Sequence, residues 1–136
     1  MLNHLFQSTT IPVLEQMVSF AQARHNVLAG NIANLDVPGY HARDLSVADF
    51  QSRLKEAIES QRGQPARSPG EMAFAPGKKL AEVAKEPKTI LRHDDVNVGM
   101  EYEVTEMVKN QMQHNLALAV MASQFRLLQA AISERV

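Results

Sequence analysis

The fold is decided by the C-terminal stretch at residues 100–136, which reads MEYEVTEMVKNQMQHNLALAVMASQFRLLQAAISERV. It contains neither Gly nor Pro and is rich in residues that favour helices. We therefore expect one helix of about 30 residues, roughly 45 Å long at 1.5 Å per residue. Apolar residues recur along it at alternating spacings of three and four, which is typical of a narrow coiled-coil stripe. This stripe consists of Val104, Met107, Leu118, Met121, Phe125, Leu128 and Ile132, and Gln111 and His114 interrupt it.

A second stripe of the same kind lies near the N-terminus. Pro12 suits the first turn of a helix, and the asparagines at 31–34 followed by Pro38 predict where that helix ends. His25 occupies one seam position, and the apolar positions are Leu14, Val18, Ala21, Leu28 and Ile32. Because neither helix can bury its stripe alone, we expect the two to form an antiparallel, coiled-coil-like hairpin.

The middle of the chain has no such regularity. Residues 46–60 predict a short helix with Ser46 as its N-cap and Asp49 at its third position. Residues 61–77 hold three of the six prolines and three of the six glycines, which predicts a loop, and residues 89–92 predict a short extended piece. The expected fold is mainly α, with a largely irregular central region. Its expected parts are an N-terminal helix and turn (1–41), a central variable region (42–99) and a C-terminal helix (100–136).

Composition narrows the functional classes. A net charge of −1 argues against nucleic acid and anionic membrane as partners, and the absence of Cys excludes disulfides, thiolate metal sites and Cys nucleophiles. The N-terminus lacks a basic start followed by a continuous apolar run, so we expect no cleaved signal peptide. No segment approaches the roughly 18 apolar residues that span a bilayer, so we expect no direct membrane insertion.

No catalytic residue, cofactor or metal ligand is expected. The five histidines include no pair at the i, i+4 spacing that places two imidazoles on one helical face. A meeting of His25 and His114 across the hairpin is open to two interpretations. They are metal ligands of a hydrolase, or polar seam residues that fix the helix register, and we favour the second. The carboxylates at Asp94, Asp95, Glu101, Glu103 and Glu106 suit the positive end of a helix dipole.

The most specific motif covers residues 31–40, NIANLDVPGY, which predict a helix end followed by a type II turn with Pro and Gly at its centre. This segment resembles the N-terminal signature of flagellar axial proteins, the rod, hook and hook-associated subunits. That signature reads Asn-x-Ala-Asn, two or three variable residues, then Thr-Pro-Gly-Tyr, and Val37 stands where the Thr is common. The matching residues are Asn31, Ala33, Asn34, Pro38, Gly39 and Tyr40.

Within that group, the C-terminal third resembles the proximal rod subunits. The matches are Glu106-Met107, Asn110-Gln111 and the run FRLLQAAI at residues 125–132, and residues 96–100 are a weakened form of a further family element. The FlgC-type sister subunits are of similar size and are the nearest alternative within the family.

The resemblance implies a non-enzymatic subunit of the flagellar basal-body rod, the drive shaft that crosses the periplasm. It implies polymerisation through the terminal helices and export by the flagellar type III apparatus without a cleaved signal peptide. The implied partners are further copies, FlgC-type and other rod subunits, the adaptor between rod and membrane ring, and the export apparatus. The alternative is a helical binding module, such as an export chaperone or adaptor, although a chaperone has no need of the turn at residues 31–40.

Overall fold

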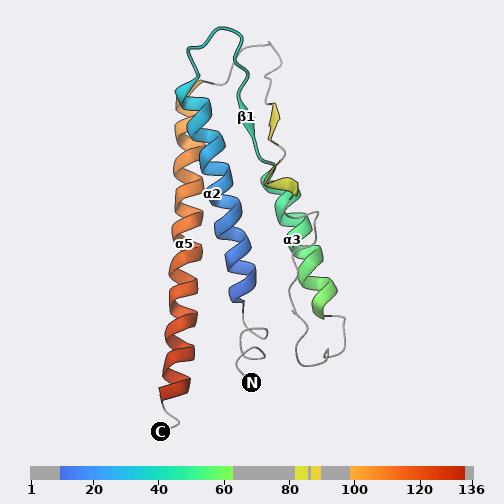
Figure 1. Ribbon diagram of the computed structural model, residues 1–136, viewed down its shortest axis with the longest axis vertical. Coiled ribbons are helices and arrows are strands. Elements are labelled where there is room, and N and C mark those ends of the chain that lie inside the picture. Colours follow the sequence, from blue (N-terminus) through green and yellow to red (C-terminus); the bar gives the residue numbers. More distant parts are fainter. Residues whose placement is uncertain (1–9, 63–81, 86, 90–98, 134–136) are drawn as a thin grey trace.

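The computed structural model describes residues 10–62, 82–85, 87–89 and 99–133. The expected fold is confirmed, since the structure is mainly helical and its two long terminal helices pack together (Figure 1). The elements in chain order are α2 (Ile11–Ala33), β1 (Arg43–Asp44), α3 (Val47–Arg62), β2 (Lys88–Thr89) and α5 (Met100–Ser133). The predicted loop at 61–77 begins later than expected, because residues 61–62 belong to α3, and Thr89 of the predicted extended piece 89–92 lies in β2. Residues 63–77, residues 90–92 and the acidic pair at 94–95 lie outside the described residues.

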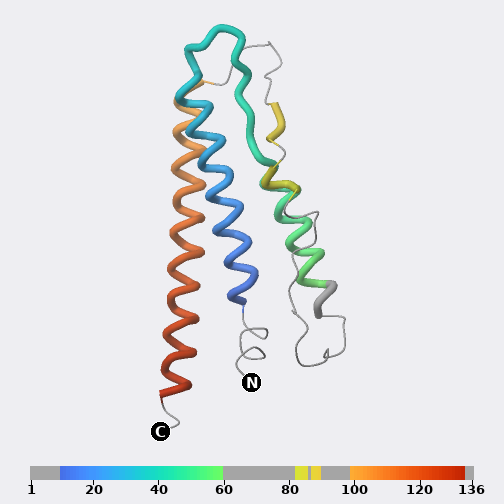
Figure 2. The backbone as a smooth tube through the Cα atoms, in the orientation of Figure 1, coloured from blue at the N-terminus to red at the C-terminus, as the bar shows by residue number. Residues whose placement is uncertain are grey.

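The α2–α5 pair is antiparallel, as Figure 1 shows. Its register is marked by Asn110, whose Nδ2 donates to the carbonyl oxygen of Ala21 at 2.8 Å. Because the helices are antiparallel, Ile11, ten residues before Ala21, lies level with Val120, ten residues after Asn110. The tube in Figure 2 shows that α5 accordingly continues past the start of α2. The residues beyond Val120, Met121–Ser133, are about 20 Å of helix at 1.5 Å per residue.

Helix α3 lies beside α2 and runs in the opposite direction (Figure 1). The rings of Phe20 on α2 and Phe50 on α3 are stacked, with centroids 4.0 Å apart and planes inclined by 11°. Leu45, Leu54 and Val83 complete this core cluster. The predicted cap of α3 is confirmed, because the backbone N–H of Asp49 donates to Ser46 Oγ at 3.1 Å.

The short strands β1 and β2 pair antiparallel, with Arg43 opposite Thr89 and Asp44 opposite Lys88. Lys88 Nζ also donates to Asp49 Oδ2 at 2.7 Å, which connects β2 to the first turn of α3. Strand β1 also contacts α2 directly, so the residues after the turn reach the helix pair.

The premise that no segment is apolar enough to span a bilayer needs correction, while the absence of membrane insertion stays a prediction. Helix α5 is long and apolar enough to cross a bilayer, since one 18-residue window has a mean hydropathy of 1.4 and is only 6% buried within the chain. The stretch contains no long run of consecutive apolar residues, because Leu, Val, Met and Ala are mixed with uncharged polar residues. Between Gln111 and Ser133 the one Asp, Glu, Lys or Arg residue is Arg126.

Candidate functional site

The turn after α2 has the predicted type II character. Gly39 has a φ of 78°, and the N–H of Tyr40 donates to the carbonyl oxygen of Val37 at 3.1 Å. The helix ends where the asparagines predict, and Asn34 caps α2 with a φ of −112°, outside the left-handed region that is common at helix ends. Its Nδ2 instead donates to the carbonyl oxygen of Gly30 at 2.8 Å, which satisfies one of the last carbonyls of the helix.

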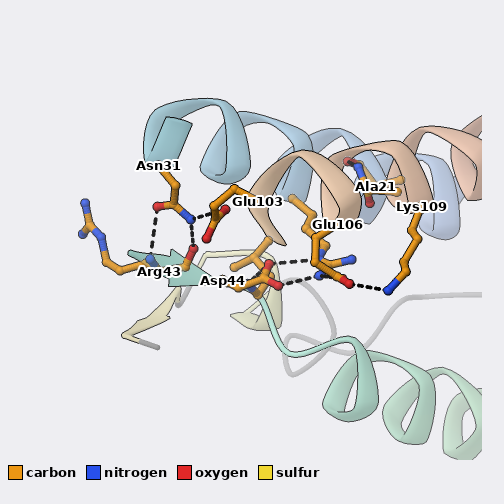
Figure 3. A network of polar contacts seen from close by, with 10 residues as sticks. Ala21, Asn31, Arg43, Asp44, Glu103, Glu106 and Lys109 are labelled. Atoms are coloured by element: carbon orange, nitrogen blue, oxygen red, sulfur yellow. Dashed lines mark hydrogen bonds and ion pairs between the residues drawn. The ribbon is translucent and has the colours of Figure 1, made fainter. Parts of the chain in front are cut away.

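The central residue of this site is Asn31, which is completely buried. Its Oδ1 accepts hydrogen bonds from Tyr40 Oη at 3.0 Å and from the N–H of Arg43 at 3.1 Å. Its Nδ2 donates to the carbonyl oxygen of Arg43 at 2.6 Å and to Glu103 Oε2 at 3.0 Å (Figure 3). All four hydrogen-bonding positions of the carboxamide are therefore used. One side chain thus joins the end of α2, the turn, β1 and α5.

A second junction, two turns away on α2, is built around Arg24. Its Nε and Nη2 donate to the two oxygens of Asp44 at 2.8 and 2.5 Å, and Nη2 also donates to Glu106 Oε2 at 2.8 Å. The hydrogen bond to Asp44 is the main cause that raises the pKa of the Arg24 guanidinium above its ordinary value. Lys109 donates to Glu106 Oε1 at 2.7 Å, and this bond, followed by that from Arg24, lowers the pKa of Glu106 (Figure 3).

Between these junctions lies Glu103, a completely buried carboxyl group on the first turn of α5. Burial raises the pKa of Glu103, while the hydrogen bond from Asn31 acts in the opposite direction. Its Oε1 is shielded from solvent and has no hydrogen-bond partner among the described residues. The site therefore places an incompletely satisfied acid between α2 and α5, near the start of α5.

The row of α5 that faces α2 is not its most apolar row. The buried residues are Glu103, Asn110 and Ala117, one heptad apart, while Met107, His114, Met121 and Leu128 are half-buried. Of the remaining predicted stripe on α5, the structure places Val104, Leu118, Phe125 and Ile132 at the surface of the chain. On α2, the structure buries Leu14, Ala21 and Leu28 and leaves Val18 and Ile32 half-buried.

The residues of the axial motif also differ in how deeply they are buried. Asn31 is buried, Asn34 and Tyr40 are half-buried, and Ala33, Pro38 and Gly39 are exposed. Their roles in assembly stay predictions, but Asn31 and Tyr40 have a visible role in holding the turn against the helices.

The two seam histidines line one small cavity of about 160 Å³ between α2 and α5. The Nδ1 atoms of His25 and His114 are both shielded from solvent, without a hydrogen-bond partner in the part of the chain that the structure describes. Within that same part, no group of three or more His, Cys, Asp or Glu side chains is arranged to hold a metal ion. A cavity of this size and polarity has room for water.

The sequence did not predict that the contacts of Asn31 and Arg24 with β1 and α5, together called the polar junction, form one connected site. From the sequence alone, Glu103 and Glu106 suit the helix dipole, and Asn110 is only a point of resemblance. The signal that could have found them is the heptad spacing of Glu103, Asn110 and Ala117, since one side of the helix repeats every seven residues. Asp44 carried no comparable signal, because its meeting with Arg24 depends on how the chain returns after the turn.

Comparison with known proteins adds to this geometry. A family model described as "Flagella basal body rod protein" matches residues 19–41, which include Arg24, Asn31 and the turn. The flagellar basal body rod protein FlgB of Escherichia coli K12 is 31% identical over 121 residues, covering 82% of this chain and 84% of that protein. The chain belongs to the FlgB family of flagellar basal body rod proteins. Bacillus subtilis FlgB is 28% identical over 129 residues, covering 93% of this chain and 95% of its own length.

A third FlgB protein, from Proteus mirabilis HI4320, is 42% identical over 48 residues, which is 35% of this chain. The FlgB family is a family of structural rod proteins and not of enzymes. Membership implies a location in the basal-body rod and association with other rod components. The polar junction is accordingly a structural site within a rod subunit.

Proposed function

We propose that the chain polymerises through its terminal helices as part of the drive shaft that serves flagellar motility. The supporting observation is that α5 is rich in apolar residues and yet remains largely exposed in the single chain. Large apolar side chains of α5 remain exposed on several sides, among them Val108, Met112, Leu116, Val120, Leu127 and Ile132. A helix that is apolar on all sides is stable when it is enclosed on all sides.

Neighbouring protein chains are better suited than a bilayer to enclose α5. The C-terminal part of this helix also carries Gln111, Gln113, Asn115, Gln124 and Gln129. Burying a carboxamide in hydrocarbon without a partner costs about 2–7 kcal/mol, whereas a helical neighbour can supply hydrogen bonds. The single charged residue, Arg126, suits the edge of such a contact.

The motif and the polar junction would then serve to hold α2 and α5 in one rigid pair. Asn31 and Arg24 connect both helices to the segment after the turn, so packing forces on α5 are transmitted to α2. In this proposal residues 1–41 and 100–136 form the axial core, and residues 42–99 form the variable region around it. The stripe residues exposed on α5 contact neighbouring subunits.

The proposed neighbours are further copies of this chain, FlgC-type and other rod subunits, the adaptor to the membrane ring, and the export apparatus during delivery. The proposed location is the part of the rod that crosses the periplasm, which the subunit reaches by flagellar type III export without a cleaved signal peptide. No cofactor has a role in this function.

A deletion strain tests the proposal. We expect basal bodies that retain the membrane ring but lack a rod, and cells that do not swim. The wild-type chain restores both, whereas Leu116→Lys, which charges an exposed apolar position of α5, restores neither although the variant folds. Intact rods in the deletion strain would refute a role in the rod.

The alternative function is a helical binding module such as a flagellar export chaperone or adaptor. It predicts that affinity purification of the chain recovers several unrelated export substrates and no rod proteins. The junction built by Asn31 favours the structural role, because a chaperone does not require its turn to be fastened to both helices.

A further inference from the structure

An apolar groove opens on the chain where α3 meets the α2–α5 pair. It has a volume of about 270 Å³, and none of its lining residues is charged. Its principal lining residues are Met17 and Phe20 from α2, Phe50, Gln51 and Leu54 from α3, and Leu116 from α5. The stacked phenylalanines and Leu54 are buried in the core, whereas Gln51 and Leu116 are exposed at the rim. The groove is therefore a preformed apolar surface bordered by carboxamides.

The end of α5 has the chemistry and the size that this groove accepts. It carries the row Phe125, Leu128 and Ile132, at the i, i+3, i+7 spacing with which an amphipathic helix enters a groove. Phe125 and Ile132 are 46% and 58% exposed, and Leu128 between them is half-buried. The groove runs along α3 from Val47 to Leu54, a separation of seven positions, and the row on α5 spans the same separation. Each corresponds to about 10 Å of helix.

We propose that the groove of one copy receives the C-terminal end of α5 from a second copy of this chain. This inference rests on the proposed function and names the two faces that meet. The occupant follows from composition. In the described part of the chain, α5 beyond Gln111 is the exposed helical segment with a single charge, and it projects past the register partner of Ile11.

The two faces are different surfaces of the same chain, so their contact is heterologous. Such a contact does not close a dimer: each copy still offers one free groove and one free helix end, and the assembly grows in an open, helical manner. The groove lies level with Met17 and Leu116, whereas the row on α5 begins at Phe125, so successive copies are also displaced along the helix axis.

Cross-linking tests which faces meet, because the chain contains no Cys. A Gln51→Cys chain is mixed with a Phe125→Cys chain and oxidised gently at increasing protein concentration. We expect the mixed disulfide dimer to exceed either homodimer at least tenfold. The control is Ser52→Cys, an exposed position on the same helix that does not line the groove, and it should give no preferred mixed dimer. No cross-link up to the solubility limit, or equal yields from Gln51→Cys and Ser52→Cys, would overturn the proposal.

A second measurement uses variants that each disable one face. Gln51→Glu is isosteric and charges the groove, and Phe125→Glu charges the helix end. We expect each variant alone to show at least a tenfold loss of assembly by light scattering, and their mixture to form closed 1:1 pairs that do not grow. Ser52→Glu adds the same charge beside the groove and should assemble normally.

The result also separates this inference from the proposed function. If Gln51→Glu builds normal rods in the deletion strain and no mixed dimer forms, the groove assignment is wrong while the rod function stands. If a photo-activated cross-linker attached to Gln51→Cys in isolated basal bodies captures a different rod subunit and not a second copy of this chain, the groove belongs to that subunit and the second-copy assignment is overturned.

Discussion

Asn31 on α2 donates a hydrogen bond to Glu103 on α5 across 3.0 Å, and both side chains are completely buried. The pair connects the helix end that precedes the turn to the first turn of the C-terminal helix, 72 residues later in the chain. It explains why a carboxamide stands at this point of the axial motif. An apolar residue would leave the backbone of Arg43, the hydroxyl of Tyr40 and the Glu103 carboxyl without this partner.

We expect Asn31→Ala to destabilise the chain by about 3 kcal/mol, because buried groups left without partners cost about 1–3 kcal/mol each. Urea unfolding followed by circular dichroism measures this. Asn26→Ala is the matched control, since Asn26 is exposed on the same helix and its hydrogen bond with Gln22 is exposed as well. A loss in the Asn31 variant as small as that in the control would contradict the role assigned to Asn31.

Arg24→Met should cost about 3–5 kcal/mol, because it leaves the shielded carboxylates of Asp44 and Glu106 without their shared cation. Lys88→Met, in contrast, removes an exposed ion pair with Asp49 and should cost clearly less, because water already solvates both charges. The two variants are compared by urea unfolding at low and high salt. Similar losses in both would mean that the Arg24 junction is no stronger than a surface pair.

The buried Glu103 predicts an unusual dependence of stability on pH. Its folded pKa lies above the ordinary value of 4.5, so the folded chain retains a proton that the unfolded chain releases. The free energy of unfolding should therefore decrease as the pH rises from about 4.5 through the folded pKa. Glu106, whose folded pKa is lowered, acts in the opposite sense, because its contribution is lost as the pH falls through that pKa.

Glu103→Gln is expected to remove the decrease above pH 4.5 while keeping an oxygen that accepts from Asn31. Urea unfolding of both chains over a pH series provides the measurement. An unchanged pH slope in the Gln variant would show that another group causes the decrease.

At the turn, Gly39→Val should destabilise the chain by about 1–2 kcal/mol, the cost of placing an L side chain in the left-handed region. The cost comes from the backbone alone, because an added Cβ would meet no atom within 4 Å. Assembly should suffer more than solubility, which motility assays and soluble yield measure. Gly39→Asn, which tolerates this conformation better, is the control, and normal swimming of the Val variant would contradict the prediction.

Two leucines should separate folding from assembly. Leu28 is 1% exposed against the helix pair, so Leu28→Ala should cost about 2–5 kcal/mol. Leu116 is 65% exposed, so Leu116→Ala should change stability by less than about 0.5 kcal/mol and yet weaken assembly. Thermal unfolding and light scattering of the two variants, side by side, test the distinction. Equal destabilisation would place Leu116 in the core of the single chain.

The helices were predictable from sequence because their signals are local. Each signal acts within a few residues. The signals are the absence of Gly and Pro after Met100, Pro12 in the first turn of α2, and the Ser46 cap of α3. The same holds for the turn at Gly39, where the backbone conformation itself selects the residue.

The row of α5 that faces α2 was harder to predict, for a physical reason. Periodicity selects the most apolar row, but close contact between α2 and α5 uses the small Ala117 and the hydrogen-bonding Asn110 and Glu103. Asn110 and Glu103 form hydrogen bonds with residues that are far away in sequence. The Phe20–Phe50 stack likewise depends on the path of the chain after the turn, which no local pattern contains.

The spacing of the junction in sequence has a consequence for the order of events in the life of the subunit. Arg24 and Asn31 lie in the first quarter of the chain, whereas their partners Glu106 and Glu103 lie in the last. A chain that is still being synthesised, or threaded through a narrow channel, therefore cannot form the contacts of Arg24 and Asn31 with α5 until these partners are present. The junction closes only after Glu103 and Glu106 have been made or have passed through the channel. The contacts of Asn31 and Arg24 with α5 thus depend on the start of that helix, and a subunit truncated before Glu103 would lack them.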